Sequence, residues 1–509
     1  MERKNRERAL WQILRTVCLV TSFFFAMARA ASAATCPKLR YGPATNGAAM
    51  ATIPITISPH RPGLVPSLDL TYNSLRPAGW VGRGWDLELG SVKNIGNTFY
   101  YAVGNTLEEL VKVKTERLGN GWYNDYYALK FERRRGMLTM HYLSQCGTDN
   151  SCSIVYSEWA GTLDGRSYTF GTFDSSNSDN IYAYTSYINV GKPLQEQWSL
   201  RYIADRYGNF TNIAYEKVWS DEVGFWVSYP TLIQFNNDTN RYDRIGFDRD
   251  PSTQTLQKIT ISPTYGQSYF YTLDYESSAD TKISRLTDVT YTKGTESSPP
   301  ISLTWTGCSG ISSSCDFLET IDNGQGGITT FAYTTASKYP VLRKVTNNNG
   351  FGSAPYETFA YSGASTSNNS LVFGIVTATR SDGTVTTTRN IASSDKFGLP
   401  SSVEQTGPIP LKTTYGWGVN SGFVRMNEVR TEHKNSSGST AGSTKNTFVY
   451  DPTNFFNLVS VTSDGNSRNR IIVSYDGWIN NLPAPQEWWR PTGVKVKEVV
   501  GGVETLRNA

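Results

Sequence analysis

The chain has 509 residues and a mass of 56.5 kDa, which at about 150 residues per domain allows two to four domains or one very large sheet system. Only 18% of its residues are charged, and 13% are aromatic, with 30 Tyr, 22 Phe and 13 Trp beside 44 Gly and 22 Pro. This composition excludes a highly charged disordered chain and a coiled coil. Large flat side chains that favour strands, separated by turn formers, predict an all-β protein.

The net charge of +4 comes from the first 33 residues, which hold six cations and two acids. The rest of the chain has 42 Lys and Arg against 42 Asp and Glu, and is neutral. A neutral body lacks the positive surface that neutralises nucleic-acid phosphates, so nucleic acid is not an expected partner.

Residues 1–33 have the order of a secretory signal peptide: a basic start, an apolar stretch from Val17 to Met27, and small residues around Ala33. The apolar stretch is shorter than the ~20 residues that span a bilayer. We therefore expect cleavage near Ala33, no membrane span afterwards, and a secreted protein in the extracellular space, the periplasm or at the cell surface.

Export places the cysteines in an oxidising compartment, where close pairs form disulfides. Two pairs are close in sequence, Cys146 with Cys152 and Cys308 with Cys315, and Cys36 is left over. We expect two local disulfides at loop tips. No pair has the C-x-x-C spacing of a metal site, so no metal is expected.

Alternation with period two recurs along the chain and predicts strands with one apolar face. Turn dipeptides of the Asn-Gly or Asp-Gly type separate these runs and predict hairpins. Residues 107–118 have apolar residues at helical spacing but also alternate in part, and we predict a strand there. The clearest alternating runs are Ile53 to Ile57, Leu68 to Tyr72, Tyr269 to Tyr275 and Ile301 to Trp305; the turn dipeptides begin at Asn120, Asp164, Asn323, Asn349, Asp382, Asp464 and Asp476.

Residues 53–89 resemble the SpvB/TcaC-type N-terminal domain of bacterial Rhs (YD-repeat) and toxin-complex B-subunit-like proteins. The resemblance lies in I-P-I-T-I-S-P-H-R-P-G-L-V-P-S-L-D-L-T-Y-N-S and in V-G-R-G-W-D-L-E-L, which contains Gly82, Gly84 and Trp85. Three later stretches resemble the same family in the same order, and together they cover most of residues 42–490. They are residues 158–171, residues 198–215 with Asp205, Gly208, Asn209 and Tyr215, and residues 321–383.

The sequence departs from the family at several points. The arginine expected soon after G-W-x-L is not obvious among Val92, Lys93 and Asn94. Such proteins usually continue into a long YD-repeat array, a self-cleaving aspartate region and a variable toxic tip, none of which is recognisable before Ala509.

The resemblance implies an extended, curved antiparallel sheet, an open shell built from successive hairpins with very little helix. After the signal peptide at residues 1–33, it implies an SpvB-type N-terminal β domain at 34–310 and a YD-repeat-like shell segment at 311–509. The residues of the Asp205, Gly208 and Asn209 motif are expected to form turns, because Asp accepts backbone hydrogen bonds there and Gly tolerates positive φ.

No nucleophile elbow, zinc helix, phosphate loop or calcium loop is present. The three histidines, His60, His141 and His433, stand apart in sequence. We therefore expect no catalytic residue, cofactor or metal, and a glycoside hydrolase with paired carboxylates is the less favoured enzymatic alternative.

Two non-enzymatic functions remain. The first is a secreted scaffold resembling the shell part of Rhs and toxin-complex proteins, with another polypeptide as the partner that completes the shell or is carried as cargo. The second is a binding module for surface glycan or protein, using the aromatic clusters Trp219 to Tyr229 and Trp488-Trp489. Ordinary burial of these aromatics is favoured over binding by their usual location in proteins.

The size of the chain favours an open sheet over a closed capsule. If about half of the residues after the signal peptide are strand, the sheet would enclose roughly 7,000 Å³, enough for ~6 kDa. This is less than a typical domain of ~100 to 150 residues, so we expect a partner to complete the shell.

Overall fold

In the computed structural model the chain divides into two units, Met1–Lys38 and Leu39–Ala509. The first unit, with the expected signal peptide and Cys36, lies outside the described residues. The described residues are 40–57, 64–76, 78–104, 106–131, 136–146, 152–174, 182–185, 195–220, 225–238, 241–277, 283–307, 316–337, 339–348, 354–367, 370–392, 395–408, 410–420, 422–435, 437–450, 458–464, 468–475, 491–500 and 503–508.

These residues form antiparallel strands joined by turns and contain no helix, which confirms the all-β prediction. No described helix is long and apolar enough to cross a membrane. Residues 107–118, where helix and strand patterns compete, lie within one strand as predicted, β9 (Thr106–Gly119).

The first strands form a small four-stranded sheet of order β1-β2-β3-β6 and a separate two-stranded hairpin, β4-β5. In β2 buried and half-buried residues alternate, as the predicted period of two requires, and Ile53 pairs with Leu70 of β3. The strands are β1 (Arg40–Pro43), β2 (Ala49–Pro54), β3 (Asp69–Asn73), β4 (Ala78–Gly79), β5 (Gly82–Arg83) and β6 (Trp85–Asp86).

The next strands close into a ring. Each pairs with its neighbour from β7 to β13, β13 pairs with β15, and β15 returns to pair with β7 through Trp198 and Val92. The sequence did not predict this closure. The strands are β7 (Ser91–Ile95), β8 (Thr98–Val103), β9, β10 (Trp122–Leu129), β11 (Gly136–Cys146), β12 (Cys152–Leu163), β13 (Arg166–Asp174), β14 (Tyr182–Thr185) and β15 (Gln195–Ala204).

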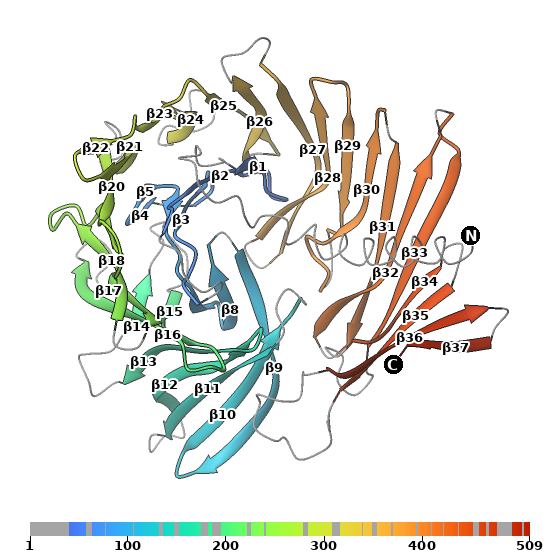
Figure 1. The fold of residues 1–509 in the computed structure, drawn as a ribbon, viewed down its shortest axis with the longest axis horizontal. Coiled ribbons are helices and arrows are strands. Elements are labelled where there is room, and N and C mark those ends of the chain that lie inside the picture. The colour runs from blue at the N-terminus through green and yellow to red at the C-terminus, as the bar shows by residue number, and fades with distance from the viewer. Residues whose placement is uncertain are drawn as a thin grey trace. The chain divides into compact units, whose positions relative to one another are not determined.

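From β15 the sheet continues strand by strand in sequence order and curves around β1–β5 (Figure 1). The first part comprises β16 (Phe210–Ser220), β17 (Phe225–Asp238), β18 (Arg241–Arg249), β19 (Leu256–Ser262), β20 (Tyr269–Ser277), β21 (Ser284–Lys293), β22 (Glu296–Ser297), β23 (Ile301–Gly307), β24 (Asp316–Asp322), β25 (Ile328–Ala336), β26 (Tyr339–Asn348), β27 (Tyr356–Ser367) and β28 (Ser370–Arg380). The second part comprises β29 (Val385–Asn390), β30 (Pro400–Thr406), β31 (Leu411–Asn420), β32 (Phe423–Lys434), β33 (Thr440–Tyr450), β34 (Leu458–Asp464), β35 (Arg468–Tyr475), β36 (Pro491–Val500) and β37 (Val503–Asn508).

Two of the predicted hairpin turns have both central residues at positive φ. Asn120 and Gly121 have φ of 50° and 82° between β9 and β10, and Asp164 and Gly165 have φ of 51° and 76° between β12 and β13. This is the geometry that suits the right-handed twist of the flanking strands. Of the other predicted turns, those after Asn349, Asp464 and Asp476 lie outside the described residues.

One hydrogen bond recurs along the sheet. A Tyr hydroxyl or Trp indole N–H donates to the backbone carbonyl of a residue in the preceding strand of the sheet. Backbone pairing of the two strands stops two residues from that acceptor in every case. The donors and acceptors among the described residues are Tyr215 and Leu200 (2.7 Å), Tyr275 and Leu256 (2.6 Å), Trp305 and Leu286 (2.9 Å), Tyr333 and Leu318 (2.9 Å), Tyr361 and Leu342 (2.7 Å), Trp417 and Pro400 (2.7 Å), and Tyr450 and Met426 (3.1 Å).

We call these pairs the aromatic caps. At each one the two strands separate, which would leave the carbonyl without its ladder partner in a buried environment. The aromatic tip supplies the missing donor, and its ring fills the space between the strands. A β-bulge in the pairing with the following strand accompanies most of the caps, for example between Asp274 and Tyr275.

We predict that Tyr275→Phe destabilises the protein by about 1–3 kcal/mol. The substitution removes only the hydroxyl that donates to the Leu256 carbonyl, and it leaves this buried carbonyl without a donor. Urea unfolding followed by tryptophan fluorescence measures the effect. Tyr265→Phe is the control, since Tyr265 is 65% exposed, and it should shift the unfolding midpoint little. Equal shifts for both variants would contradict the cap.

The capping tyrosines also predict a loss of stability in alkali. Burial raises their pKa values above the ordinary value near 10, for Tyr215, Tyr275, Tyr333 and Tyr361. Above pH 10 the unfolded chain therefore loses protons that the folded chain keeps, and the free energy of unfolding falls by up to about 1.4 kcal/mol per pH unit for each such tyrosine. Below pH 10 this contribution is fully present.

Urea unfolding at pH 8, 9.5, 10.5 and 11, with tyrosinate absorbance recorded in parallel, tests this pH dependence. We expect a set of tyrosines that ionises only when the protein unfolds. Ionisation of all tyrosines near pH 10 without unfolding would show that the caps are open to solvent.

Candidate functional site

The described part of residues 40–89 lies on the inner side of the curved sheet, and we call it the inner segment (Figure 1). Its apolar residues belong to the main core together with those of β15–β27. Ile53, Leu70, Tyr72 and Trp85 are almost completely buried. The inner segment therefore covers the apolar face of the sheet and supplies about a quarter of the buried residues of the main core.

The inner segment and the residue after it are hydrogen-bonded to four of the cap acceptors. Where the strands separate, the amide of the acceptor residue is freed as well as its carbonyl, and this amide donates inward. The four bonds run from Leu200 N to Gly90 O (2.9 Å), from Leu256 N to Trp80 O (2.7 Å), from Leu318 N to the Tyr72 hydroxyl (3.1 Å) and from Leu342 N to Gly47 O (2.8 Å). The caps thus satisfy the carbonyl, and the inner segment satisfies the amide, of the same residues.

The predicted motif residues Gly82, Gly84 and Trp85 make a close contact between the inner segment and the sheet. Gly82 has φ of +94°, and a Cβ there would lie 2.9 Å from the Ser284 carbonyl oxygen. Gly84 has φ of +71°, and a Cβ there would lie 2.6 Å from the Tyr72 ring. Glycine is therefore required at both positions by backbone conformation and by space. The ring of Trp85 is fully buried, 5.4 Å from that of Tyr72.

Tyr72 joins the inner segment to the cap at Leu318. Its hydroxyl accepts the Leu318 amide, while the Tyr333 hydroxyl donates to the Leu318 carbonyl. Burial raises the pKa of Tyr72 to about 12, so this hydroxyl stays protonated at neutral pH. Sequence reasoning assigned Tyr72 to a strand but gave it no role.

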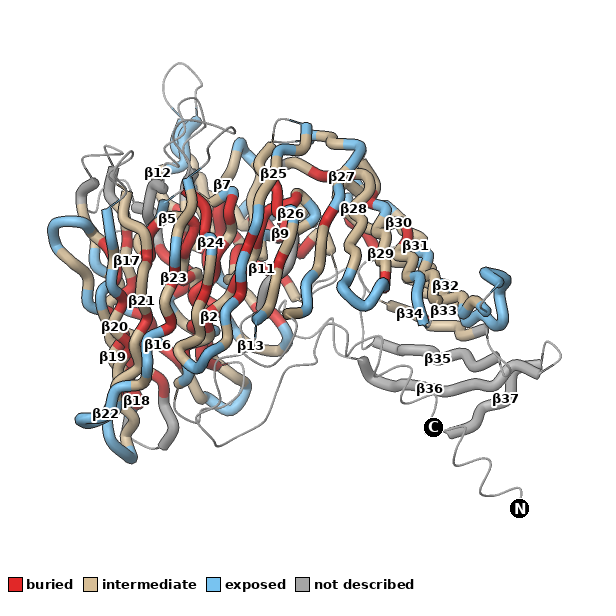
Figure 2. Tube along the Cα trace, turned by 90° about the horizontal axis from the view of Figure 1, so that it is seen from above, coloured by how far each residue is buried: buried red, intermediate tan, exposed pale blue. Residues whose placement is uncertain are grey.

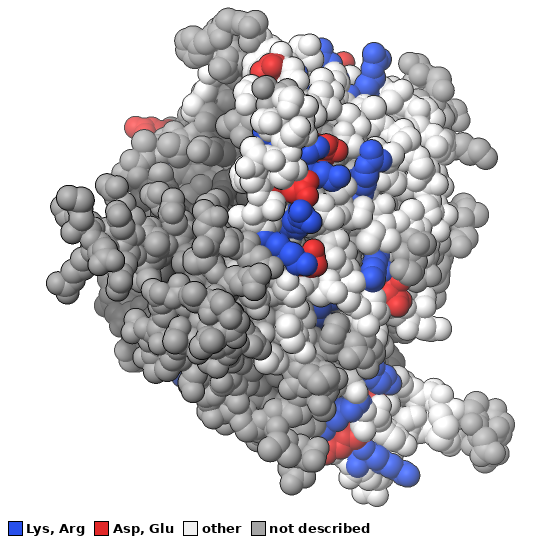
Figure 3. Space-filling view, turned by 90° about the vertical axis from the view of Figure 1, so that its right-hand side faces the viewer, with Lys and Arg blue, Asp and Glu red and all other residues white. Residues whose placement is uncertain are grey.

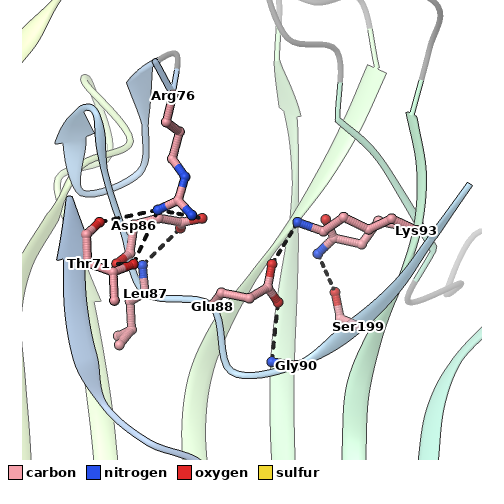
Figure 4. A network of polar contacts seen from close by, with 9 residues as sticks. Thr71, Arg76, Asp86, Leu87, Glu88, Gly90, Lys93 and Ser199 are labelled. Atoms are coloured by element: carbon pink, nitrogen blue, oxygen red, sulfur yellow. Dashed lines mark hydrogen bonds and ion pairs between the residues drawn. The ribbon is translucent and has the colours of Figure 1, made fainter. Parts of the chain in front are cut away.

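A polar network stands where the inner segment enters the ring (Figure 4). The Glu88 carboxylate accepts from Lys93 Nζ at 2.7 Å and from the Gly90 amide at 3.2 Å. The side chains of Lys93 and Glu88 are 11% and 9% exposed, so each charge needs the other. Lys93 lies on β7 opposite Gln197 of β15, at the closure of the ring.

Asp205, Gly208 and Asn209 form a turn between β15 and β16, in the role expected for them. The Asp205 carboxylate accepts from the amides of Tyr207 (2.8 Å) and Asn209 (3.0 Å), and Gly208 has φ of +82°. Residues 323–327 and 435–439 repeat this geometry, with Asn323 and Asn435 as the acceptors. These motif residues organise turns, and Tyr215 is the aromatic cap of the same unit.

Of the two expected disulfides, one is present: Cys146 and Cys152 are bonded at the end of the β11–β12 hairpin. Cys308 and Cys315 lie outside the described residues, and that pair stays a prediction. In the described part of the chain no group of three or more His, Cys, Asp or Glu side chains is placed to hold a metal ion. His141 stacks on Trp122 with ring centroids 4.6 Å apart, and His60 lies outside the described residues.

The aromatic clusters of the binding-module alternative are described only in part. Tyr229 packs against Trp80 of the inner segment, with the Arg249 guanidinium 4.3 Å from its ring. Nothing is described of the side chains of Trp219, Phe225 and Trp226, nor of Trp488 and Trp489.

The inner segment covers only the first part of the sheet. Figure 2 shows buried positions concentrated in β16–β26 and mainly intermediate ones in β29–β34. By the alternation of the paired strands, the inner face of β29–β34 carries Thr386, Thr388, Val403, Gln405, Leu411, Thr413, Tyr415, Trp417, Asn427, Val429, Thr431, His433, Thr444, Asn446, Phe448, Val461 and Ser463.

Among the described residues, the positions assigned to this inner face hold no Lys, Arg, Asp or Glu. The opposite face carries ion pairs such as Lys434 with Glu404 and Lys445 with Glu428. Figure 3 shows cations and carboxylates interspersed on this side of the molecule. The cap acceptor here is Pro400, which has no amide to donate inward. The inner face of β29–β34 is thus uncharged and half-exposed.

Residues 43–98, which contain most of the inner segment and the Glu88–Lys93 pair, match the family model SpvB, described as the Salmonella virulence plasmid 65kDa B protein. This confirms the predicted resemblance for these residues. No curated protein sequence matches the chain.

Solved structures show the same fold. A crystal structure of TcdB2-TccC3 aligns at a TM-score of 0.65 and 9% identity, over 93% of this chain and 48% of that one. The Photorhabdus luminescens Tc holotoxin pore with a TccC3 mutation aligns at 0.64 and 9%, over 94% and 47%. The chain spans about half the length of these proteins, and it has the β fold of an SpvB- and Tc-toxin-type domain.

We predict that Gly82→Ala destabilises the protein by more than Gly96→Ala. Both glycines have positive φ, but a Cβ at Gly96 meets nothing within 4 Å, while at Gly82 it meets the Ser284 carbonyl. Backbone strain costs about 1 kcal/mol at either position, and the clash adds to it only at Gly82. Thermal unfolding of the two variants measures the difference in stability. An equal loss of stability in both would contradict the close contact at Gly82.

Proposed function

We propose that this protein is an exported, non-enzymatic scaffold of the toxin-complex shell type, which carries a second polypeptide on the uncharged inner face of β29–β34. Export rests on the signal-peptide pattern of residues 1–33. The scaffold role is supported by the fold shared with TcdB2-TccC3.

The proposal rests on a change in burial along one continuous face of the sheet. In β16–β26 this face is buried beneath the inner segment, whereas in β29–β34 the same repeated apolar positions are half-exposed. Val429 and Tyr415 are paired across β31 and β32 at such positions. A strand-forming segment with few charges would bury them as the inner segment buries Ile213 and Ile245.

The two sequence-based domains enter this proposal as parts of one scaffold. Residues 34–310 would supply the SpvB-type part and residues 311–509 the shell part. The inner segment bonds to both, through Leu256 in the first and Leu342 in the second. The carbohydrate alternative remains a prediction from the sequence, because the side chains of its tryptophans lie outside the described residues.

Binding of a permanently unfolded polypeptide tests the function. Reduced, carboxymethylated α-lactalbumin with a fluorescent label serves as the probe, and anisotropy gives the affinity. Val429→Lys places a charge on the inner face and should weaken binding about tenfold, equivalent to about 1.4 kcal/mol. Arg430→Ala changes the next residue, on the opposite face, and is the matched control.

Binding that is absent in the wild-type protein, or weakened equally by both substitutions, would overturn the proposed cargo face. A parallel screen of glycan and ester substrates tests the non-enzymatic assignment. Turnover abolished by a single carboxylate, serine or histidine substitution would contradict it.

A further inference from the structure

The β31–β32 hairpin packs against the ring at a point far away in sequence. Phe423, Val424 and Arg425 are 4%, 1% and 3% exposed although they follow directly on the hairpin turn. Phe423 forms a small second core with Tyr126, Ala128 and Met137, and Val111 and Val113 pack against that cluster. The strands involved, β9–β11, belong to the ring.

One backbone carbonyl holds this contact. The Lys130 oxygen accepts both the Val424 amide at 3.1 Å and Arg425 Nη1 at 2.6 Å, across almost 300 residues of sequence. The Arg425 guanidinium also lies 5.3 Å from the Phe423 ring. Gly422 approaches the ring so closely that a Cβ there would lie 3.1 Å from Val111. We call residues 422–425 the clasp.

The clasp is a small contact compared with those that hold the first part of the sheet. The main core takes buried residues from the inner segment, the ring and β16–β27, and within the described ranges it takes none from β29–β34. Within the described residues, β29–β34 continue the sheet through the β28–β29 pairing at one side and the β34–β35 pairing at the other. Their contacts outside this ladder include the clasp and a hydrogen bond from Ser365 Oγ of β27 to the Ala392 carbonyl after β29. Few buried apolar contacts give a segment a low free energy of local opening.

We propose that the clasp opens reversibly and that β29–β34 then move as one unit about the β28–β29 connection. In the closed state Arg425 and Val424 are bonded to Lys130, and in the open state these bonds and the second core are lost together. Opening would widen access to the inner face of β29–β34. This inference concerns the motion itself and does not depend on the proposed cargo.

Native-state hydrogen exchange of the full chain at low urea concentrations tests the motion in the wild-type protein. Amides of residues 424–432 and 126–130 should exchange through a common opening at lower urea than amides of residues 259–261 and 341–345, which pack in the main core. Exchange of all four segments in one global step would overturn the clasp.

Substitution separates the clasp from general stability. Arg425→Ala and Met137→Ala, on the two sides of the contact, should each raise exchange in residues 424–432 and 126–130 about tenfold and leave residues 259–261 within about twofold. Arg430→Ala is the control, because Arg430 is on the same strand in an exposed pair with Glu432. A uniform rise throughout the chain, or no rise in either segment, would contradict the proposal.

Discussion

The hydrogen bond from an aromatic tip to a freed backbone carbonyl is the interaction on which the rest of the sheet depends. In this curved sheet neighbouring strands separate at each cap, and each separation leaves a carbonyl and an amide without their ladder partners. A tyrosine or tryptophan satisfies the carbonyl locally, since its ring is apolar and its hydroxyl or indole N–H donates a hydrogen bond. Repeated at Leu200, Leu256, Leu318 and Leu342, the solution lets the sheet bend without buried, unsatisfied backbone.

The backbone amides that are freed at the caps explain the position of the inner segment. The amides of the same leucines point inward, and Gly90, Trp80, Tyr72 and Gly47 accept them. Hydrogen bonding thereby fixes the register of the inner segment against strands that are distant in sequence. At Pro400 no amide exists, and there the inner face is half-exposed. The part of the sheet that the inner segment covers thus has cap acceptors with an inward-pointing amide, and the half-exposed part has an acceptor without one.

Local pattern predicted much of the fold. Alternation located strands such as β20 and β23, and the Asn120 and Asp164 dipeptides located hairpin turns, because both signals act between near neighbours. Ring closure through β15 and the clasp at Lys130 join residues far apart in sequence, and no spacing encodes them. The caps were within reach: an apolar residue followed three positions later by Ile or Val, then a Tyr or Trp on the next strand, recurs from Leu200 to Tyr450. The repeat spans several strands and is not visible within any one alternating run.

The caps also indicate how such a chain tolerates change in length. The separation between donor and acceptor ranges from 15 residues, at Tyr215 and Tyr333, to 24 at Tyr450, while the bond itself keeps nearly the same length. All of this variation falls between the two strands, in the connecting loops and the strand ends beside them. Because the entropy of closing a loop grows only slowly with its length, these connections are natural places to graft foreign peptides. In each unit the connecting loop can therefore be exchanged, whereas the distance between the aromatic donor and the carbonyl acceptor must be kept.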